Sequence, residues 1–215
     1  MREIEMELTD FLVHNASRDW WGPTTARSEL GKVVVTSPLQ HWHTFKTLEL
    51  AYRDAYSSQL NDRYLSKWKN YTQLSAWASG KSFSSGIGMV REAIPKAEAP
   101  TLRAMPGSLP AATYWARVAW TNAAGAEGAP SEPAVLSLPE GSRLSVESKD
   151  PPALAQGWNV YIGASPDETM RQNDEPIGVG TPWATTDSGV QEGASVGNGQ
   201  EAEYFLTIRR LIERG

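Results

Sequence analysis

Residues 37–80 place large apolar side chains at helical intervals, and many of these side chains are aromatic. Ser37-Pro38 is typical of a helix start, because serine can cap a helix and proline at the first helical position has no N–H to leave unpaired. Asn61-Asp62 interrupts the pattern and can cap a second helix, which Gly80 would end. We therefore predict two helices of about 20 residues each, forming an antiparallel hairpin or one kinked helix.

The aromatic residues of these helices have two interpretations. Two helices cannot enclose a dry core by themselves, so the rings either complete a small core within the chain or pack against neighbouring copies. A second aromatic feature, Trp20-Trp21, lies in a predicted turn and could either anchor a partner or fold back on its own domain. The candidate residues for packing between subunits are Trp42, Phe45, Tyr52, Tyr56, Trp68 and Tyr71.

From residue 109 onward, short alternating runs of apolar and polar residues are separated by Gly, Pro and Asn turns. In residues 113–121 the alternation places Val118 and Trp120 on one face, and in residues 157–163 it separates Trp158 from Tyr161. Regular short strands of this kind favour a β-sandwich over a parallel sheet. The predicted strands are 113–121, 133–138, 143–147, 157–163, 177–179 and 183–186.

Charge and composition change between these two parts of the chain. Residues 1–95 hold 11 Lys and Arg against 10 Asp and Glu, whereas residues 96–199 hold 6 against 12. The Pro-rich stretch between them suggests a stiff connector, and a Gly-rich stretch followed by an apolar pattern over 200–214 suggests a flexible segment and a final helix. We predict an α+β multidomain chain with a helical connector domain 1–95, a linker 96–110, a β-sandwich 111–189, and a flexible segment with a C-terminal helix 190–215.

Several functional classes find no support in the sequence. There are no Cys residues, and His41 and His43 lack the spacing of a helical metal pair. The net charge of −5 argues against a protein that coats nucleic acid through a basic surface. No run of about 18 apolar residues could cross a membrane, and the start of the chain lacks the pattern of a secretory signal peptide. We therefore assign no catalytic residue, metal site or cofactor, and expect that the protein is not an enzyme.

Part of the predicted β-sandwich resembles a fibronectin type III domain. The segment TYWARVAWTNAAGAEGAPSEP resembles the penultimate strand, the turn and the start of the last strand of that family. GWNVYIGAS resembles its middle strand, and ATTDSG resembles a strand end. Their order along residues 109–189 is shifted, as in a circular permutation. The resemblance implies an immunoglobulin-like sandwich and does not specify a function.

The arrangement of the whole chain resembles the head–tail connector, or neck adaptor, proteins of tailed bacteriophages. The segments SPLQHWHTFKTLELAYRDAY and NDRYLSKWKNY resemble their helical domain, and an immunoglobulin-like domain follows. The resemblance implies a structural virion protein in the neck, assembled in the host cytoplasm and without membrane contact. Its partners would be other copies in a cyclic ring of about twelve, the portal protein, and tail or neck proteins. Double-stranded DNA would pass through the ring without specific binding.

The predicted C-terminal helix could pack on its own helical domain or dock on the portal protein as an amphipathic helix. A different function stays open as well, namely another tail, fibre-attachment or surface-binding structural protein with an immunoglobulin-like module. An enzyme or an enzyme accessory domain is the third alternative. The candidate portal-docking residues are Tyr204, Phe205, Leu206, Ile208, Arg209, Arg210, Leu211 and Ile212.

Overall fold

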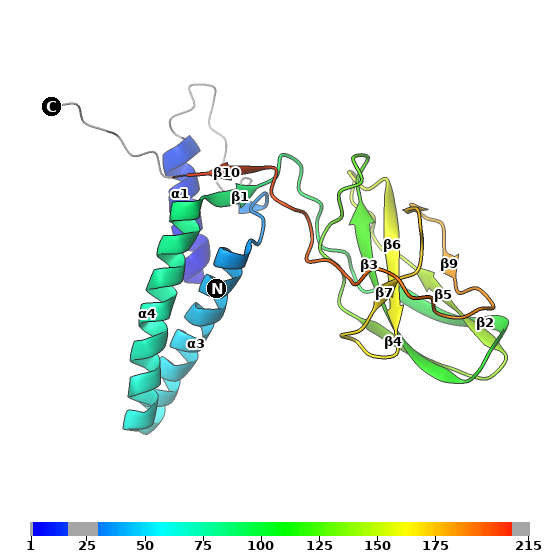
Figure 1. Ribbon diagram of the computed structural model, residues 1–215, viewed down its shortest axis with the longest axis horizontal. Coiled ribbons are helices and arrows are strands. Elements are labelled where there is room, and N and C mark those ends of the chain that lie inside the picture. Colours follow the sequence, from blue (N-terminus) through cyan, green and yellow to red (C-terminus); the bar gives the residue numbers. More distant parts are fainter. Residues whose placement is uncertain (1, 17–29, 208–215) are drawn as a thin grey trace. The chain divides into compact units, whose positions relative to one another are not determined.

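The computed structural model describes residues 2–16 and 30–207 (Figure 1). The chain divides into two compact units. One, here called the helical unit, consists of Met1–Glu92 together with Ala202–Gly215, and the other, the β unit, consists of Ala93–Glu201. The helices and antiparallel sheets confirm the predicted mixture of α and β structure. The β unit is therefore an insertion within the helical unit, and the chain passes between the units twice.

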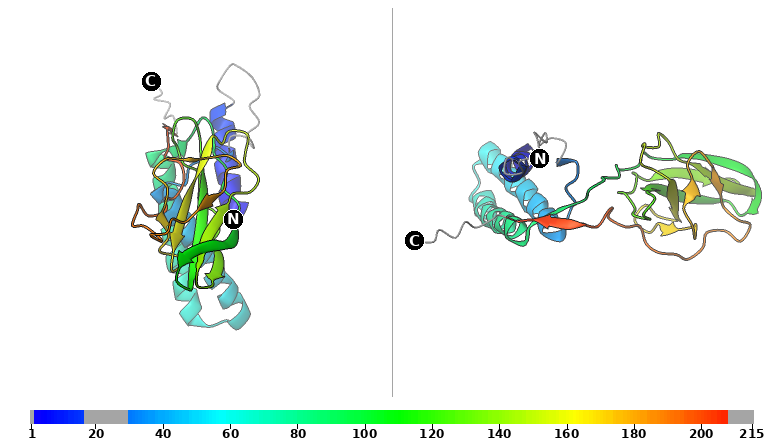
Figure 2. Two further views of the ribbon diagram at one scale, coloured as in Figure 1. Left: turned by 90° about the vertical axis from the view of Figure 1, so that its right-hand side faces the viewer. Right: turned by 90° about the horizontal axis from the view of Figure 1, so that it is seen from above.

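The helical unit contains α1 (Arg2–Ala16), α3 (Ser37–Gln59) and α4 (Asp62–Ser85). Helices α3 and α4 form the antiparallel hairpin that the sequence predicts, and α1 packs beside them (Figures 1 and 2). Helix α4 runs beyond Gly80, so the prediction that this glycine ends the helix is wrong. A side chain at Gly80 would meet no atom within 4 Å, and the turn that follows places Phe83 on the core. That packing outweighs the weak helix propensity of one glycine.

The turn between α3 and α4 needs only two residues. Leu60 adopts a left-handed conformation with φ of 48°, and its N–H donates to the carbonyl of Tyr56 at 2.7 Å. Asn61 caps α4, since its side chain accepts the N–H of Arg63 at 3.0 Å, and this confirms the predicted cap. At the start of α3 the cap position is Thr36 rather than the predicted Ser37, and it makes no side-chain cap hydrogen bond.

A short two-stranded sheet joins the two chain segments that make up the helical unit. β1 (Ile87–Met89) pairs antiparallel with β10 (Tyr204–Leu206), in a register that aligns Ile87 with Leu206 and Met89 with Tyr204. The predicted C-terminal helix is therefore wrong for 204–206. Alternate residues Tyr204 and Leu206 pack on the helical core, whereas Phe205 between them is 55% exposed, which is the two-residue period of a strand. Residues 208–215 lie outside the described part of the chain.

The core of the helical unit lies where α1, the start of α3, the end of α4 and β1 meet. Trp42 is 1% exposed and Met89 is fully buried. Half-buried side chains from α1, α3, α4 and β10 surround these residues. The fully packed members of this cluster are Ile4, Leu8, Leu12, Leu39, Trp42, Ala78, Ile87 and Met89.

The first sheet of the β unit has three strands in the order β2 (Thr101–Leu109), β5 (Ser142–Glu147) and β9 (Trp183–Ala184). Residues 101–109 belong to the predicted linker, so that prediction is wrong for them. β2 is an edge strand, and its register shifts between Pro106 and Leu109. Edge strands tolerate proline and bulges because one side of the backbone makes no ladder hydrogen bonds.

The second sheet contains β4 (Ala134–Leu138), β3 (Ala112–Thr121), β6 (Gly157–Gly163) and β7 (Met170–Arg171) in this order, and β8 (Ile177–Gly178) also pairs with β6. All of these pairings are antiparallel. The predicted strands over 113–121 and 157–163 are confirmed by β3 and β6. None of the helices within the described residues is long and apolar enough to cross a membrane.

Residues from both sheets share one hydrophobic core. The predicted inward face of β3 is confirmed, since Val118 and Trp120 are at most 2% exposed. The predicted separation on β6 is confirmed too, because Trp158 belongs to the core cluster and Tyr161 does not. The buried members of this core are Ile94, Ala97, Ala116, Val118, Trp120, Leu138, Leu144, Val146, Trp158, Val160 and Ile162.

Candidate interface on the helical hairpin

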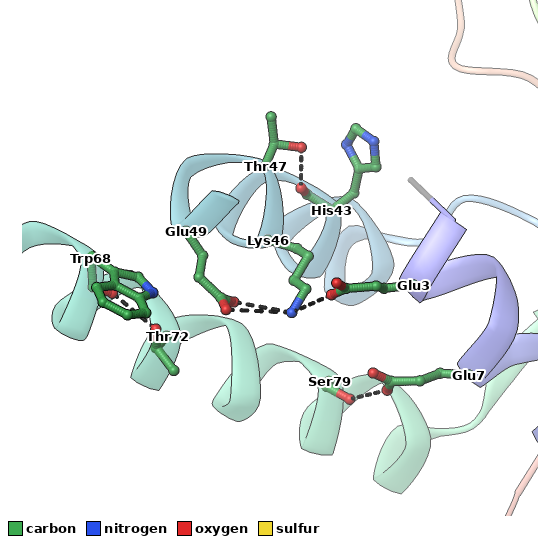
Figure 3. Close-up of polar contacts among 9 residues, drawn as sticks. All are labelled: Glu3, Glu7, His43, Lys46, Thr47, Glu49, Trp68, Thr72 and Ser79. Carbon is green, nitrogen blue, oxygen red and sulfur yellow. Dashed lines mark hydrogen bonds and ion pairs between the residues drawn. The ribbon is translucent and has the colours of Figure 1, made fainter. Parts of the chain in front are cut away.

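Helix α1 covers only the part of the hairpin nearest to β1. Its first turns contact α3 and α4 through two polar contacts, Lys46 Nζ to Glu3 Oε2 at 2.7 Å and Ser79 Oγ to Glu7 Oε2 at 3.4 Å (Figure 3). Beyond this level α3 and α4 continue to the Leu60 turn with only each other as neighbours within the described part of the helical unit (Figure 1). We call this part, residues 50–74, the distal hairpin.

Aromatic rings hold the two helices of the distal hairpin together. Tyr52 and Tyr71 stack in parallel planes with centroids 5.4 Å apart. Tyr56 lies 6.0 Å from Trp68, and Tyr52 lies 6.4 Å from Tyr64. All five side chains are half-buried, so each ring covers a neighbour and still presents part of its surface to solvent. The distal hairpin therefore offers aromatic surface that a partner could bury.

Basic side chains border this aromatic surface. Lys67 Nζ lies 5.6 Å from the centroid of the Tyr52 ring, within the range of a cation–π contact. Arg63 is one helical turn before Lys67, so both side chains project from the same side of α4. The exposed charged residues of the distal hairpin are Arg53, Asp54, Asp62, Arg63, Lys67 and Lys69, a net charge of +2.

The structure brings together four of the six residues predicted to pack between subunits. Tyr52, Tyr56, Trp68 and Tyr71 lie on the distal hairpin as described above. Trp42 does not belong to this surface, because it is buried in the helical core with its ring edge-on to Phe83 at 5.5 Å.

The remaining predicted contact residues lie elsewhere. Phe45 is half-buried at the boundary between the core and the distal hairpin, 6.5 Å from Tyr71. Trp20 and Trp21, the predicted partner anchor, lie outside the described residues. One exposed aromatic escaped the sequence analysis: Trp77 on α4 is 56% exposed. Because Trp77 lies outside the apolar stripe of α4, the helical period could have predicted that its side chain faces solvent.

A partly buried ion cluster joins α1 to α3 at the base of the distal hairpin. Lys46 Nζ lies 2.7 Å from Glu3 Oε2 and 3.3 Å from Glu49 Oε2, and Glu49 is only 8% exposed (Figure 3). Burial alone would lower the pKa of Lys46, but hydrogen bonds to Glu3 and Glu49 raise it above its ordinary value. The hydrogen bond from Lys46 lowers the pKa of Glu3. The cluster therefore stabilises the charged forms of both partners.

The predicted portal-docking residues do not form one helical surface. Tyr204 and Leu206 pack on the core of the helical unit, and Phe205 faces away from it. Residues Ile208, Arg209, Arg210, Leu211 and Ile212 lie outside the described part of the chain. A partner that bound Tyr204 or Leu206 would have to displace β10.

In the β unit, four polar side chains form a partly buried hydrogen-bonded cluster. The Tyr161 hydroxyl donates to both carboxylate oxygens of Glu127 at 2.7 Å, and Asn159 Nδ2 donates to the same carboxylate. Asn173 Nδ2 in turn donates to Asn159 Oδ1 at 2.9 Å. Burial and the hydrogen bond to Glu127 raise the pKa of Tyr161, so its hydroxyl stays a donor. These hydrogen bonds fix side chains to one another, which is a structural role.

Neither a group of metal-ligating side chains in the described residues nor a match to a family model or curated protein indicates what the chain does. Within residues 2–16 and 30–207, no group of three or more His, Asp and Glu side chains could hold a metal ion. No family model matches the chain, and no curated protein matches it.

Proposed function

We propose that the chain is a structural subunit of a ring-shaped phage head–tail connector, which joins the portal to the tail in the virion neck and forms part of the DNA channel. The observation that carries this proposal is the distal hairpin, where two helices expose half-buried tyrosine and tryptophan rings that no third element within the described part of the helical unit covers. The two segments that resemble connector proteins are α3 and the first half of α4, which form this hairpin.

Such a surface suits contact between copies of the chain. Tyrosine and tryptophan bury large areas with few rotatable bonds, and both are enriched where interfaces gain most of their affinity. When one patch of a subunit binds a different patch of the next, the assembly closes into a ring if the rotation permits. In such a ring, the net charge of −5 would suit a channel, because strongly basic walls would bind DNA phosphates.

The finer fold of the β unit is part of this proposal. We infer an immunoglobulin-like sandwich of the fibronectin type III kind with a permuted strand order. Its support is the core shared by the two antiparallel sheets, and the adjacent pairing of β3, the strand most similar to that family, with β4 and β6. In the connector this module would contact tail or neck proteins.

The oligomeric state of the 215-residue chain tests the proposal. We expect mass photometry and negative-stain images to show closed rings in place of a 23.6 kDa monomer. Changing Tyr56 and Trp68 together to Ala should abolish the rings while the helical circular dichroism is retained. Trp77→Ala on the same helix is the matched control and should leave rings intact. A strict monomer, both alone and mixed with the portal protein of the same phage, would refute the connector function.

Portal attachment is tested separately from ring formation. We propose that residues following β10 dock on the portal, because Tyr204 and Leu206 are used within the helical unit. A chain that ends at Thr207 keeps β10, so we expect it to fold and form rings but lose binding to the portal protein in pull-down. Unchanged portal binding would show that the contact lies elsewhere.

A further inference from the structure

The distribution of charge indicates which surface the distal hairpin contacts. The distal hairpin carries a net charge of +2, whereas the β unit holds 6 basic and 13 acidic residues, a net charge of −7. Two copies of the distal hairpin facing each other would bring like charges together, which disfavours a symmetric hairpin–hairpin contact. The β unit of another copy has the opposite charge and therefore provides a complementary partner.

Several basic residues of the β unit are already engaged within it. Lys96 pairs with Glu132 at 2.6 Å, and Arg103 lies 3.8 Å from Glu147. Arg117 donates from its guanidinium to backbone carbonyls. These contacts leave the excess of acid concentrated at other places on the surface of the unit.

One such place is the edge of the second sheet, where β7 and β8 both pair with β6. The turns on either side of β7 carry exposed Asp167, Glu168, Asp174 and Glu175. Exposed apolar side chains lie among them, since Met170 is 36% and Val179 is 39% exposed. We call residues 167–179 the acidic edge. The acidic edge holds four carboxylates and one basic residue, the half-buried Arg171, which gives a net charge of −3. Its acidic and apolar side chains therefore complement the basic and aromatic side chains of the distal hairpin.

We propose that the distal hairpin of one copy docks on the acidic edge of the next copy, with Arg63 and Lys67 facing the carboxylates around β7. This inference rests on the ring assembly proposed above and specifies its contact. Because the two surfaces differ, the contact is head-to-tail, which is the geometry that generates rings instead of two-fold dimers. The aromatic rings supply the buried area, and the charges select the partner surface.

A charge exchange between two variants of the 215-residue chain tests the contact. The hairpin variant carries Arg63→Glu and Lys67→Glu, and the edge variant carries Asp174→Lys and Glu175→Lys. Each variant alone places like charges at every contact, so we expect the loss of rings from both. When the variants are mixed in equal amounts, they can alternate around the ring, and opposite charges then meet at every contact. High-mass oligomers should therefore return. The mass of differently tagged copies would show both variants in each oligomer.

The controls distinguish failure of this inference from failure of the connector function. A variant with Glu98→Lys and Glu140→Lys changes two exposed charges of the β unit away from the acidic edge and should assemble normally. If the wild type forms rings but the edge variant also assembles alone, the acidic edge is not the docking surface and the inference is wrong. If both variants fail alone and their mixture stays monomeric, the direct pairing of these surfaces is likewise refuted. A wild type that never assembles refutes the proposed function itself.

Discussion

The pairing of β10 with β1 predicts that adjacent residues of one strand differ sharply in their effect on stability. Leu206 packs half-buried on the helical core, while Phe205 is 55% exposed on the opposite face. Truncating a fully buried leucine to alanine costs about 2–5 kcal/mol, so a half-buried one should cost about 1–2 kcal/mol. Phe205→Ala should change the free energy of unfolding by less than about 0.5 kcal/mol, as is usual for exposed sites.

Far-UV circular dichroism at the helical signal measures this difference, because the described helices all lie in the helical unit. In guanidinium titrations, Leu206→Ala should lower the midpoint of the helical transition with an unchanged slope, and Phe205→Ala should overlay the wild type. An effect of Phe205→Ala equal to or larger than that of Leu206→Ala would refute the strand register and favour another orientation of the segment.

Three further predictions concern the ion cluster, the polar cluster and the insertion. Lys46→Met should lower the free energy of unfolding by about 1–3 kcal/mol at pH 7, since Glu49 then stays buried beside another carboxylate. The pKa of Glu3 is depressed and that of Lys46 is raised, so the loss of unfolding free energy should shrink as the pH falls below 4.5 or rises above 10.5, the ordinary pKa values of the two groups. Urea titrations at several pH values measure this dependence, and a loss that does not change with pH would contradict the pairing. Burial and the Glu127 hydrogen bond raise the pKa of Tyr161 above its ordinary value of 10.0, so Tyr161→Phe should leave the tyrosine absorbance change near pH 10 unaltered; a smaller change in the variant would contradict the Glu127 contact. A chain in which Glu92 is joined directly to Ala202 should fold into the helical unit alone, because the five residues left between Met89 and Tyr204 suit a β-hairpin loop; a chain without a cooperative helical transition would argue against the insertion.

The sequence predicts elements whose periodicity extends over several turns or residues. The hairpin of α3 and α4 and the strands β3 and β6 follow directly from such patterns. β10 was missed because three residues are too few to separate a period of 2 from a helical one, and its partner β1 is more than 100 residues away. β2 was missed since Pro106 and Gly107 are typical of a linker and are tolerated here by an edge strand.

The sequence could predict an aromatic stripe on the two helices, but it could not predict which residues of the stripe are exposed. In the structure Tyr52, Tyr56, Trp68 and Tyr71 contact one another within the chain, and their packing between subunits stays a prediction. Trp42 lies on the same stripe, yet it is buried because α1 and β1 pack over that end of the hairpin. Which part of a stripe is covered depends on these tertiary contacts, and no local pattern encodes them.

The position of β10 also sets an order of events during synthesis. Its residues 204–206 leave the ribosome only after the last residue of the β unit, Glu201, has been made. A nascent chain can therefore complete the inserted module while the first module still lacks the strand that closes it. Until residues 204–206 have been made, Ile87 and Met89 lack their strand partner, so a shorter nascent chain would carry an incomplete helical module.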